Sequence, residues 1–295
     1  MKNLNKNKNR VKVFDVVNII LMLCMGAVTL VPCMTVVAKA FSDPRFVLSG
    51  SVGIWPRGFQ LDTVWYVLKK AEFLNAFKVS VFVTVVGTTI AMILTILAAY
   101  PLSKPSLKGR KFFLYVFVFV MLFNAGMVPK YLLYRSLNLT NTIWALVFSG
   151  AFSVSNMFIV KNFFESLPES VEEAAKIDGA SNMQVLFKVV LPMSTPVLAT
   201  VTLFYGVSYW STYFSGVLYI TDPKLKSLQH YLYDMITMAL SADGMGAAEL
   251  EALSAISSEN LRSATIVLST IPILVLYPYL QKYFVKGISI GSVKG

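Results

Sequence analysis

Residues Val79–Tyr100 read VSVFVTVVGTTIAMILTILAAY, an apolar stretch that contains no charged side chain. An α-helix rises about 1.5 Å per residue, so a helix of this length crosses the ~30 Å hydrocarbon core of a bilayer. Lipid offers no water to the backbone N–H and C=O groups, which must therefore bond within the segment. The stretch predicts a transmembrane α-helix.

Further apolar runs on both sides of this one are long enough to cross a bilayer in the same way. They are Val13–Val37, Phe112–Val128, Thr142–Val160, Pro196–Tyr219 and Ala264–Leu280. Hydrophobic residues make up 56% of the chain and charged residues 14%, against about 45–50% and about 25% in soluble proteins. No run shows the two-residue alternation of a barrel strand. The sequence predicts an all-α integral membrane protein with six transmembrane helices.

The N-terminal residues 1–12 are basic and precede the first apolar run. A secretory signal peptide begins in the same way, but Val13–Val37 is too long for its apolar region and no clear small-residue cleavage site follows. We therefore interpret the run as a retained first span. The chain shows no linker and no internal repeat, so residues 13–295 are expected to form a single six-helix domain.

The basic residues indicate how the chain is threaded through the membrane. The formal net charge is +11, and Lys and Arg flank the apolar runs, most densely in the short turn Lys104–Lys111. Short basic segments stay on the cytoplasmic side. The pattern predicts a multi-pass protein of the bacterial plasma membrane with both termini in the cytoplasm. The same charge suits lipid headgroups, and we expect no nucleic-acid partner.

Several chemical roles are disfavoured by what the sequence lacks. Cys24 and Cys33 point to opposite sides of one helix, and a single histidine, His230, provides too few ligands for a metal site. The last five spans hold no ionisable side chain in their cores, which disfavours an ion-coupled carrier. The phosphate-binding pattern GxxxxGK followed by Ser or Thr does not occur. We expect no catalytic residue, and any ATP would be bound by another polypeptide.

Two segments expected outside the cell also show helical patterns. Leu61–Lys78 mixes aromatic side chains with lysines and predicts an interfacial helix. The extracellular loop 221–262 carries apolar residues at the spacing of one helix face. They are Leu228, Tyr231, Leu232, Met235 and Ile236. This face can pack on the protein's own outer surface or serve as a docking platform for an external protein.

Residues 161–195, between spans four and five, show the pattern of a structured cytoplasmic segment. Ser166 and Glu169 have the spacing of a capping box at a helix start, and Gly179 suits the left-handed residue that follows a helix end. Ser181 can cap a second helix, which prolines end before span five. The sequence predicts a short helix, a glycine turn and a second helix.

The residues of this segment resemble the EAA loop of ABC-importer permeases. The matching residues are Glu173, Ala174, Ala175, Gly179, Leu191 and Pro192. The run Glu173–Gly179 followed by Ala180 is similar to the carbohydrate-importer, MalG-like branch of these binding-protein-dependent permeases. Residues between Pro129 and Thr142 and the tail Gln281–Gly287 also resemble that branch. Within it, the chain looks most like the lipoprotein-associated and alginate-type permeases for complex oligosaccharides and polysaccharides.

The resemblance implies a fold, a role and a set of partners. The fold is that of type I ABC importer permeases (MetI-like), in which the first helix of the loop is a coupling helix held in a cleft of the ATPase. The six matching residues would then couple this chain to the ATPase, with Glu173 paired to a basic group on it. The implied partners are a second homologous permease subunit, two ATP-binding subunits, an extracellular solute-binding protein, a saccharide and the lipid bilayer. ATP and magnesium would belong to the ATPase, and no cofactor is expected here.

Other functions remain open at this point. A permease for peptides or amino acids would share the architecture, although the run from Lys176 to Ala180 argues against it. A secondary carrier or channel with an incidental loop is disfavoured by the uncharged spans. A membrane enzyme is more remote, because the sequence shows no catalytic constellation.

Span five carries the best candidates for the substrate pathway. Tyr205, Tyr209 and Tyr213 recur every four residues, with Trp210 beside them. Aromatic faces suit the C–H surfaces of sugars. Asn124 and Asn156 in neighbouring spans are further candidates. The alternative for all of these residues is ordinary packing between helices, where aromatic and polar side chains are also found.

Overall fold

The computed structural model describes residues 13–123, 125–238 and 258–291, the last sixteen of these as backbone only. Within this part of the chain every regular element is helical, which confirms the predicted all-α class. The chain forms two compact units. Unit 1 comprises residues 1–68 and 238–268, and unit 2 comprises residues 69–237 and 269–295.

The runs predicted to span the membrane all fall in helices, but several of these helices are broken. Among the described residues, α1 (Val13–Ala40) and α4 (Ala71–Ser103) are long and apolar enough to cross a membrane unbroken. Three bent helix pairs raise the number of candidate spans to five. The pairs are α5 (Arg110–Leu122) with α6 (Met127–Ser136), α7 (Ile143–Ser149) with α8 (Val154–Glu165), and residues 182–193 with α12 (Thr195–Ser211). The sixth expected run lies within α16 (Ser258–Gly291).

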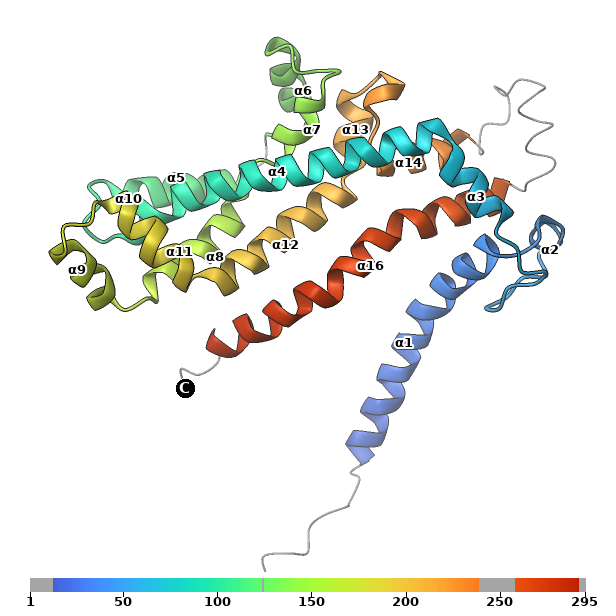
Figure 1. Ribbon diagram of the computed structural model, residues 1–295, viewed down its shortest axis with the longest axis horizontal. Helices are drawn as coiled ribbons and strands as arrows, with labels where there is room; N and C mark the ends of the chain where they lie inside the picture. Colours follow the sequence, from blue (N-terminus) through green and yellow to red (C-terminus); the bar gives the residue numbers. More distant parts are fainter. Residues whose placement is uncertain (1–12, 124, 239–257, 292–295) are drawn as a thin grey trace, which may run out of the picture. The chain divides into compact units, whose positions relative to one another are not determined.

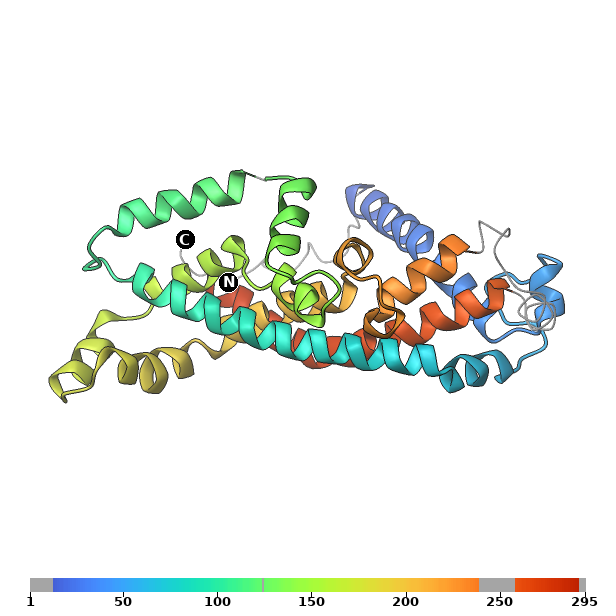
Figure 2. The ribbon, with the colours of Figure 1, turned by 90° about the horizontal axis from the view of Figure 1, so that it is seen from above.

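The sequence predicted one continuous helix for each of spans three, four and five, and this prediction is wrong. Span three is divided before Gly126, whose φ of +82° favours glycine, and Figure 2 shows α5 and α6 running in different directions. Span four bends by 50° between Ser149 and Val154. Span five ends its long helix at Ser211, and α13 (Phe214–Tyr219) follows as a separate turn of helix.

Unit 1 is held together by polar contacts between its two ends. Asn260, at the start of α16, is fully buried, and its amide donates to the carbonyl oxygens of Lys39 at 2.9 Å and Ser42 at 2.8 Å. Lys39 also pairs with Glu259 at 2.5 Å. Two short helices, α2 (Pro44–Leu48) and α3 (Asp62–Lys69), follow α1 in this unit. The polar contacts fix the end of α1 to the start of α16.

The predicted interfacial helix at Leu61–Lys78 is not continuous. It divides at Lys70, which is extended (φ −65°, ψ 124°), so α3 ends before it and α4 begins after it. Residues 71–78 become the first two turns of α4 because the helix continues into the apolar run without a break.

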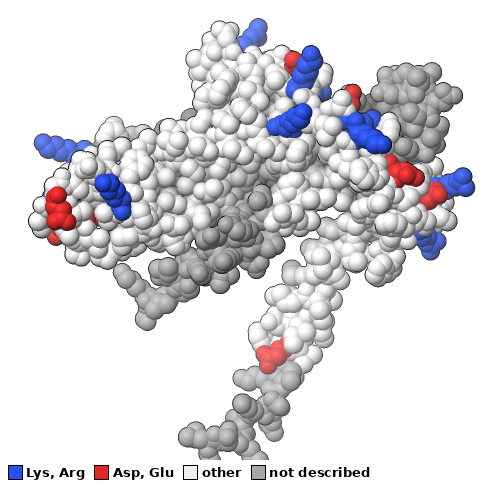
Figure 3. Space-filling model, viewed as in Figure 1, with Lys and Arg blue, Asp and Glu red and all other residues white. Residues whose placement is uncertain are grey.

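Unit 2 is built around α4, which packs along α12 and α8 (Figure 1). Its core includes Val83, Ala91, Met157, Val160 and Val201, all buried. On the face shown in Figure 3, charged side chains lie toward the ends of α4 and leave its middle uncharged. This distribution is the one expected of a helix that crosses a bilayer.

The predicted apolar helix of the 221–262 loop is confirmed as α14 (Leu228–Met238). Leu228 and Leu232 are buried, and the Leu228 N–H donates to Ser80 Oγ on α4 at 2.7 Å. Before α14 lies a single 3₁₀ turn, η2 (Pro223–Leu225). The packing alternative is thus realised for the inner face of α14. Residues 239–257 of the loop lie outside the described residues, and docking of an external protein stays a prediction.

His230 is buried within α14 at 4% exposure, where its Nε2 lies 3.6 Å from Asp234 Oδ1. Lys226 pairs with the same carboxylate at 2.5 Å. Burial lowers the pKa of His230 below its ordinary value of 6.5, Asp234 opposes this shift, and Lys226 adds to it. The side chain therefore favours its neutral form in the folded protein.

Candidate functional site

The 161–195 loop folds as the helix–turn–helix that its sequence predicts. Its first helix is α9 (Glu169–Ile177), and α10 (Asn182–Val185) begins the second. Gly179 lies between them with φ +84°, and its N–H donates to Lys176 O at 3.0 Å, while Ala180 N–H donates to Ala175 O at 3.0 Å. These two bonds form a Schellman motif, which satisfies the carbonyl groups at the end of α9. The left-handed conformation predicted for Gly179 after the helix end is confirmed, and its part in coupling to an ATPase stays a prediction.

The two predicted caps have different outcomes. Ser181 Oγ accepts from Gln184 N–H at 3.4 Å and Gln184 Oε1 accepts from Ser181 N–H at 2.8 Å, so Ser181 caps the second helix in a capping box. The capping box expected at Ser166 and Glu169 is wrong. Ser166 instead follows the end of α8 as its C-cap residue, where its hydroxyl donates to Phe163 O at 2.7 Å, and Pro168 precedes α9 without a side-chain cap.

The Glu-Ala-Ala triplet is divided between two faces of α9. Ala175 packs against the core of unit 2, whereas Glu173 and Ala174 are exposed. Ile177, near them on the outer face, is 86% exposed. Ala175 is partly buried on the protein itself, and contact of either alanine with a partner stays a prediction. The outer face presents a carboxylate, a small residue and a large apolar side chain.

The inner face of α9 carries a buried acid that the sequence analysis did not single out. Glu172 is only 8% exposed, and Lys104 Nζ donates to its Oε2 at 2.5 Å. Lys104 also lies 4.9 Å from the centre of the Tyr100 ring, within the range of a cation–π contact. Lys104 belongs to the basic turn that follows α4. The ion pair therefore fixes the first helix of the loop to the end of α4.

Further ion pairs hold the base of the loop. Glu165, the last residue of α8, pairs with Arg110 and lies 2.8 Å from Lys161 Nζ. Arg110 Nε donates to Leu102 O at 2.8 Å and so reaches α4 as well. A cleft of about 580 Å³ lies between the loop and the basic turn, lined by charged residues of the loop, such as Glu169 and Lys176, and of the turn, Lys104 and Arg110. These ion pairs could have been anticipated from the sequence, because it places a basic turn and an acidic loop on the same side of the membrane.

The second half of the loop carries Leu191 and Pro192 away from α9. A π-helical turn, η1 (Leu186–Val190), follows α10 and leads into α11 (Leu191–Met193). Pro192 has no N–H to donate to the preceding turn, which is a recognised cause of irregular helix geometry. Leu191 is partly buried against the core, and Pro192 is exposed. The chain then bends by 84° into α12.

Tyr205 and Tyr209 are packed inside the chain, and their place on the substrate pathway stays a prediction. They lie on α12 and are 3% and 6% exposed. The Tyr209 hydroxyl donates to Val147 O at 2.6 Å, and the Tyr205 hydroxyl accepts from Ser153 N–H at 3.0 Å. Val147 and Ser153 flank the break in span four, where backbone groups lose their helical partners. The two tyrosine hydroxyls therefore provide hydrogen-bond partners for backbone groups at the break in span four.

The other pathway candidates lie in different settings. Trp210 is 7% exposed and its Nε1 donates to Ser269 O at 3.1 Å, while Tyr213 is 46% exposed. Asn156 is partly buried in the first turn of α8, and its N–H donates to the Ser153 hydroxyl at 3.4 Å. Asn124 lies outside the described residues. Among the described residues, the structure does not bring Trp210, Tyr213 and Asn156 together with Tyr205 and Tyr209 around one space.

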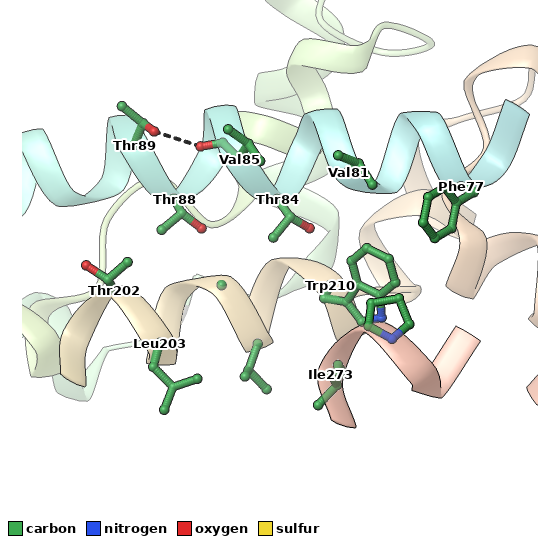
Figure 4. A pocket seen from close by; sticks show the side chains of 13 residues that line it. Phe77, Val81, Thr84, Val85, Thr88, Thr89, Thr202, Leu203, Trp210 and Ile273 are labelled. Carbon is green, nitrogen blue, oxygen red and sulfur yellow. Dashed lines mark hydrogen bonds between the residues drawn. The ribbon is translucent and has the colours of Figure 1, made fainter. Parts of the chain in front are cut away.

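Trp210 borders a cavity of about 480 Å³ between α4, α12 and α16 (Figure 4). Its lining is mostly apolar, with Phe77 and Trp210 at one end. Thr84 and Thr88 turn buried hydroxyls toward it, and neither hydroxyl has a hydrogen-bond partner among the described residues. An apolar lining with few polar groups suits hydrocarbon better than a saccharide.

The fold and the loop define a class: a multi-pass helical membrane protein that holds a charged helix–turn–helix at one end of its bundle. The sequence matches the family model described as "Binding-protein-dependent transport system inner membrane component" over residues 12–290. The chain belongs to this family. Its members are transport components, which agrees with the expectation that this chain is not an enzyme.

Three similar proteins narrow the comparison. Protein LplC of Bacillus subtilis (strain 168) is 41% identical over 284 residues, covering 96% of each chain. The polygalacturonan/rhamnogalacturonan transport system permease protein YtcP of the same organism is 38% identical over 98% of this chain and 100% of its own. A chain from the crystal structure of a bacterial ABC transporter involved in the import of the acidic polysaccharide alginate has a TM-score of 0.88 at 32% identity, with 95% of this chain and 100% of that chain covered. The predicted resemblance to ABC-importer permeases and their type I fold is confirmed.

Proposed function

We propose that this chain is the membrane subunit of an ATP-driven importer of oligosaccharides or polysaccharides, in which it forms half of the translocation pore. A second, homologous permease subunit forms the other half, and an extracellular solute-binding protein delivers the saccharide. Two ATP-binding subunits bind on the cytoplasmic side. ATP binding closes these subunits and turns the cavity outward, and hydrolysis resets it.

The observation that carries this proposal is the two-sided construction of α9. Its inner face is held to the protein by Glu172 and Ala175, and its outer face exposes Glu173, Ala174 and Ile177. A small residue beside an exposed large one lets a partner surface approach closely and gives it a side chain to bury. The exposed carboxylate of Glu173 can pair with a basic group on that partner. A helix with this surface is suited to a cleft in an ATPase subunit.

The ion pairs also support the predicted orientation. They join the basic turn after α4 to the 161–195 loop, so both segments lie on the same side of the membrane. An ATPase that meets α9 must then be on the side of the basic turn, which is cytoplasmic by its charge. This arrangement agrees with cytoplasmic N- and C-termini.

The saccharide substrate is inferred from the relatives. One relative is named for polygalacturonan and rhamnogalacturonan transport, and the matching crystal structure is of an alginate importer. Both names describe polysaccharides. We assign complex saccharides to this chain as a class, on the strength of similarity along nearly its full length.

The assembly is tested by purifying the chain in mild detergent from its own membranes with its co-purifying proteins. Ile177→Asp should reduce recovery of the ATP-binding subunit, because it puts a charge where an apolar side chain is to be buried. Leu48→Asp is the matched control, since Leu48 is 68% exposed in unit 1, far along the chain from α9, and should leave recovery unchanged. Recovery of the folded wild-type chain alone, in several detergents, would overturn the proposal.

A further inference from the structure

Of the three acids in α9, the structure gives one a role that differs from the others. Glu169 and Glu173 are exposed, whereas Glu172 is buried against the end of α4 and paired with Lys104. A buried carboxylate requires a partner, since an unpaired charge in this setting is strongly unfavourable. The two residues are separated by 68 positions in sequence, so their contact depends on the tertiary placement of the loop.

The pair is the ionic link that reaches α9 in the described part of the chain. The other ion pairs of this region involve Glu165, which lies at the base of the loop and joins α8 to the basic turn. Around α9, the residues that pack on the core are Leu167 just before the helix, Ala175 within it and Ala180 just beyond it, and α9 also contacts α10 and η1. Its own end is closed by the Schellman motif at Gly179. Without the ion pair, α9 would keep its helical form but lose a strong constraint on its angle.

The other end of the link lies on a helix that runs the length of unit 2. Lys104 is the residue directly after α4, and α4 packs along both α12 and α8 (Figure 1). A displacement of α9 is therefore passed to the main packing helix at its end. Small residues alone would transmit it less directly, because they can slide over the surface that they touch.

We propose that Glu172 and Lys104 are positioning residues, whose ion pair transmits the movement of α9 to α4 and so couples ATP hydrolysis to transport. This inference rests on the proposed function, because it requires an ATPase bound to α9. It assigns the inner acid of the helix to the permease itself and leaves the outer acid, Glu173, to the partner.

The test uses the complete transporter, with its ATPase and binding protein, reconstituted in lipid vesicles. ATP hydrolysis and saccharide uptake are measured on the same vesicles, and the readout is the number of saccharides imported per ATP hydrolysed. Glu172→Gln and Lys104→Met should each lower this ratio about fivefold or more, the size of an ordinary coupling between two sites, while hydrolysis continues. Exchange of the two charges, Lys104→Glu with Glu172→Lys, should restore much of the ratio.

Two exposed residues provide matched controls. Glu169→Gln removes a negative charge from the same helix as Glu172, and Lys108→Met removes a positive charge from the same turn as Lys104. Both variants should keep the ratio near that of the wild type. A merely structural role would lower both activities together and leave the ratio unchanged.

The outcomes separate the inference from the proposed function. A normal ratio in both single variants, or a charge-exchanged pair that is as impaired as they are, overturns the positioning role and leaves the transporter assignment intact. A wild-type chain that binds no ATPase, or that transports without ATP, overturns the proposed function itself.

Discussion

Gly87 offers a sharp test of how α4 packs against the broken span, because the Tyr209 ring fills the space where a side chain would be. The Cβ atom of an alanine at position 87 would lie 2.6 Å from Tyr209 Cζ. Carbon atoms pack at about 3.5–4.0 Å, so the ring would have to retreat by about 1 Å. Its retreat is restricted, because the ring also lies close to Gly150, where an added Cβ would be 3.1 Å away.

Gly87→Ala should therefore destabilise the protein by about 2–6 kcal/mol. Overpacking accounts for about 1–3 kcal/mol of this free energy, and loss of the 2.6 Å bond from the Tyr209 hydroxyl to Val147 O accounts for about 1–3 kcal/mol. The assay is thermal denaturation of the purified protein in detergent. The measured quantity is the fraction of protein that stays monodisperse after heating to each temperature.

The control is Gly206→Ala, a second glycine inside a spanning helix. Its added Cβ would meet only Thr88 Oγ1, at an ordinary 3.9 Å. Alanine is the better helix former by up to about 1 kcal/mol, so this change should be neutral or stabilising. Equal denaturation midpoints for the two variants would refute the packing of Tyr209 between the two glycines.

Two further predictions concern groups outside that contact. Tyr205→Phe leaves the Ser153 N–H without its acceptor and should cost about 1–3 kcal/mol in the same assay, whereas Tyr213→Phe, at a 46% exposed position, should cost little. Equal losses from the two changes would contradict the bridging role. His230 has a folded pKa below 6.5, so the unfolded chain binds more protons in acid and stability should fall as the pH drops below about 6.5. His230→Gln should flatten this part of the curve of midpoint against pH. An unchanged slope would mean that Asp234 offsets the burial of the imidazole.

The positions of the spans could be predicted from the sequence because lipid imposes them. An uncharged run of sufficient length has to be helical, whatever its neighbours are. The break in span four could not be predicted, since residues 150–153 are neither charged nor proline. The Ser153 N–H, which has no helical partner at the break, donates instead to the hydroxyl of Tyr205 on α12. The position of the break therefore depends on a contact with α12, which the sequence of span four alone does not contain.

The candidate site was predictable to a similar extent. Gly179 and Ser181 act through bonds to residues within four positions, so their spacing was sufficient to assign them. Glu172 was not distinguished from Glu169 and Glu173, because its partner lies on another helix. Tyr205 and Tyr209 were assigned to the pathway for their chemistry, yet their contacts are set by where the break in span four falls.

The tyrosine bridges have a consequence for the order in which this protein is made. Val147 and Ser153 enter the membrane before their partners have been synthesised, since Tyr209 follows Val147 by 62 residues and Tyr205 follows Ser153 by 52. Until α12 arrives, the broken segment has unsatisfied polar groups that hydrocarbon would penalise. Span four should therefore wait beside the insertion machinery, or in contact with water, and be released into lipid together with span five. A ribosome-arrest series that stops between these two spans would find the fourth still accessible.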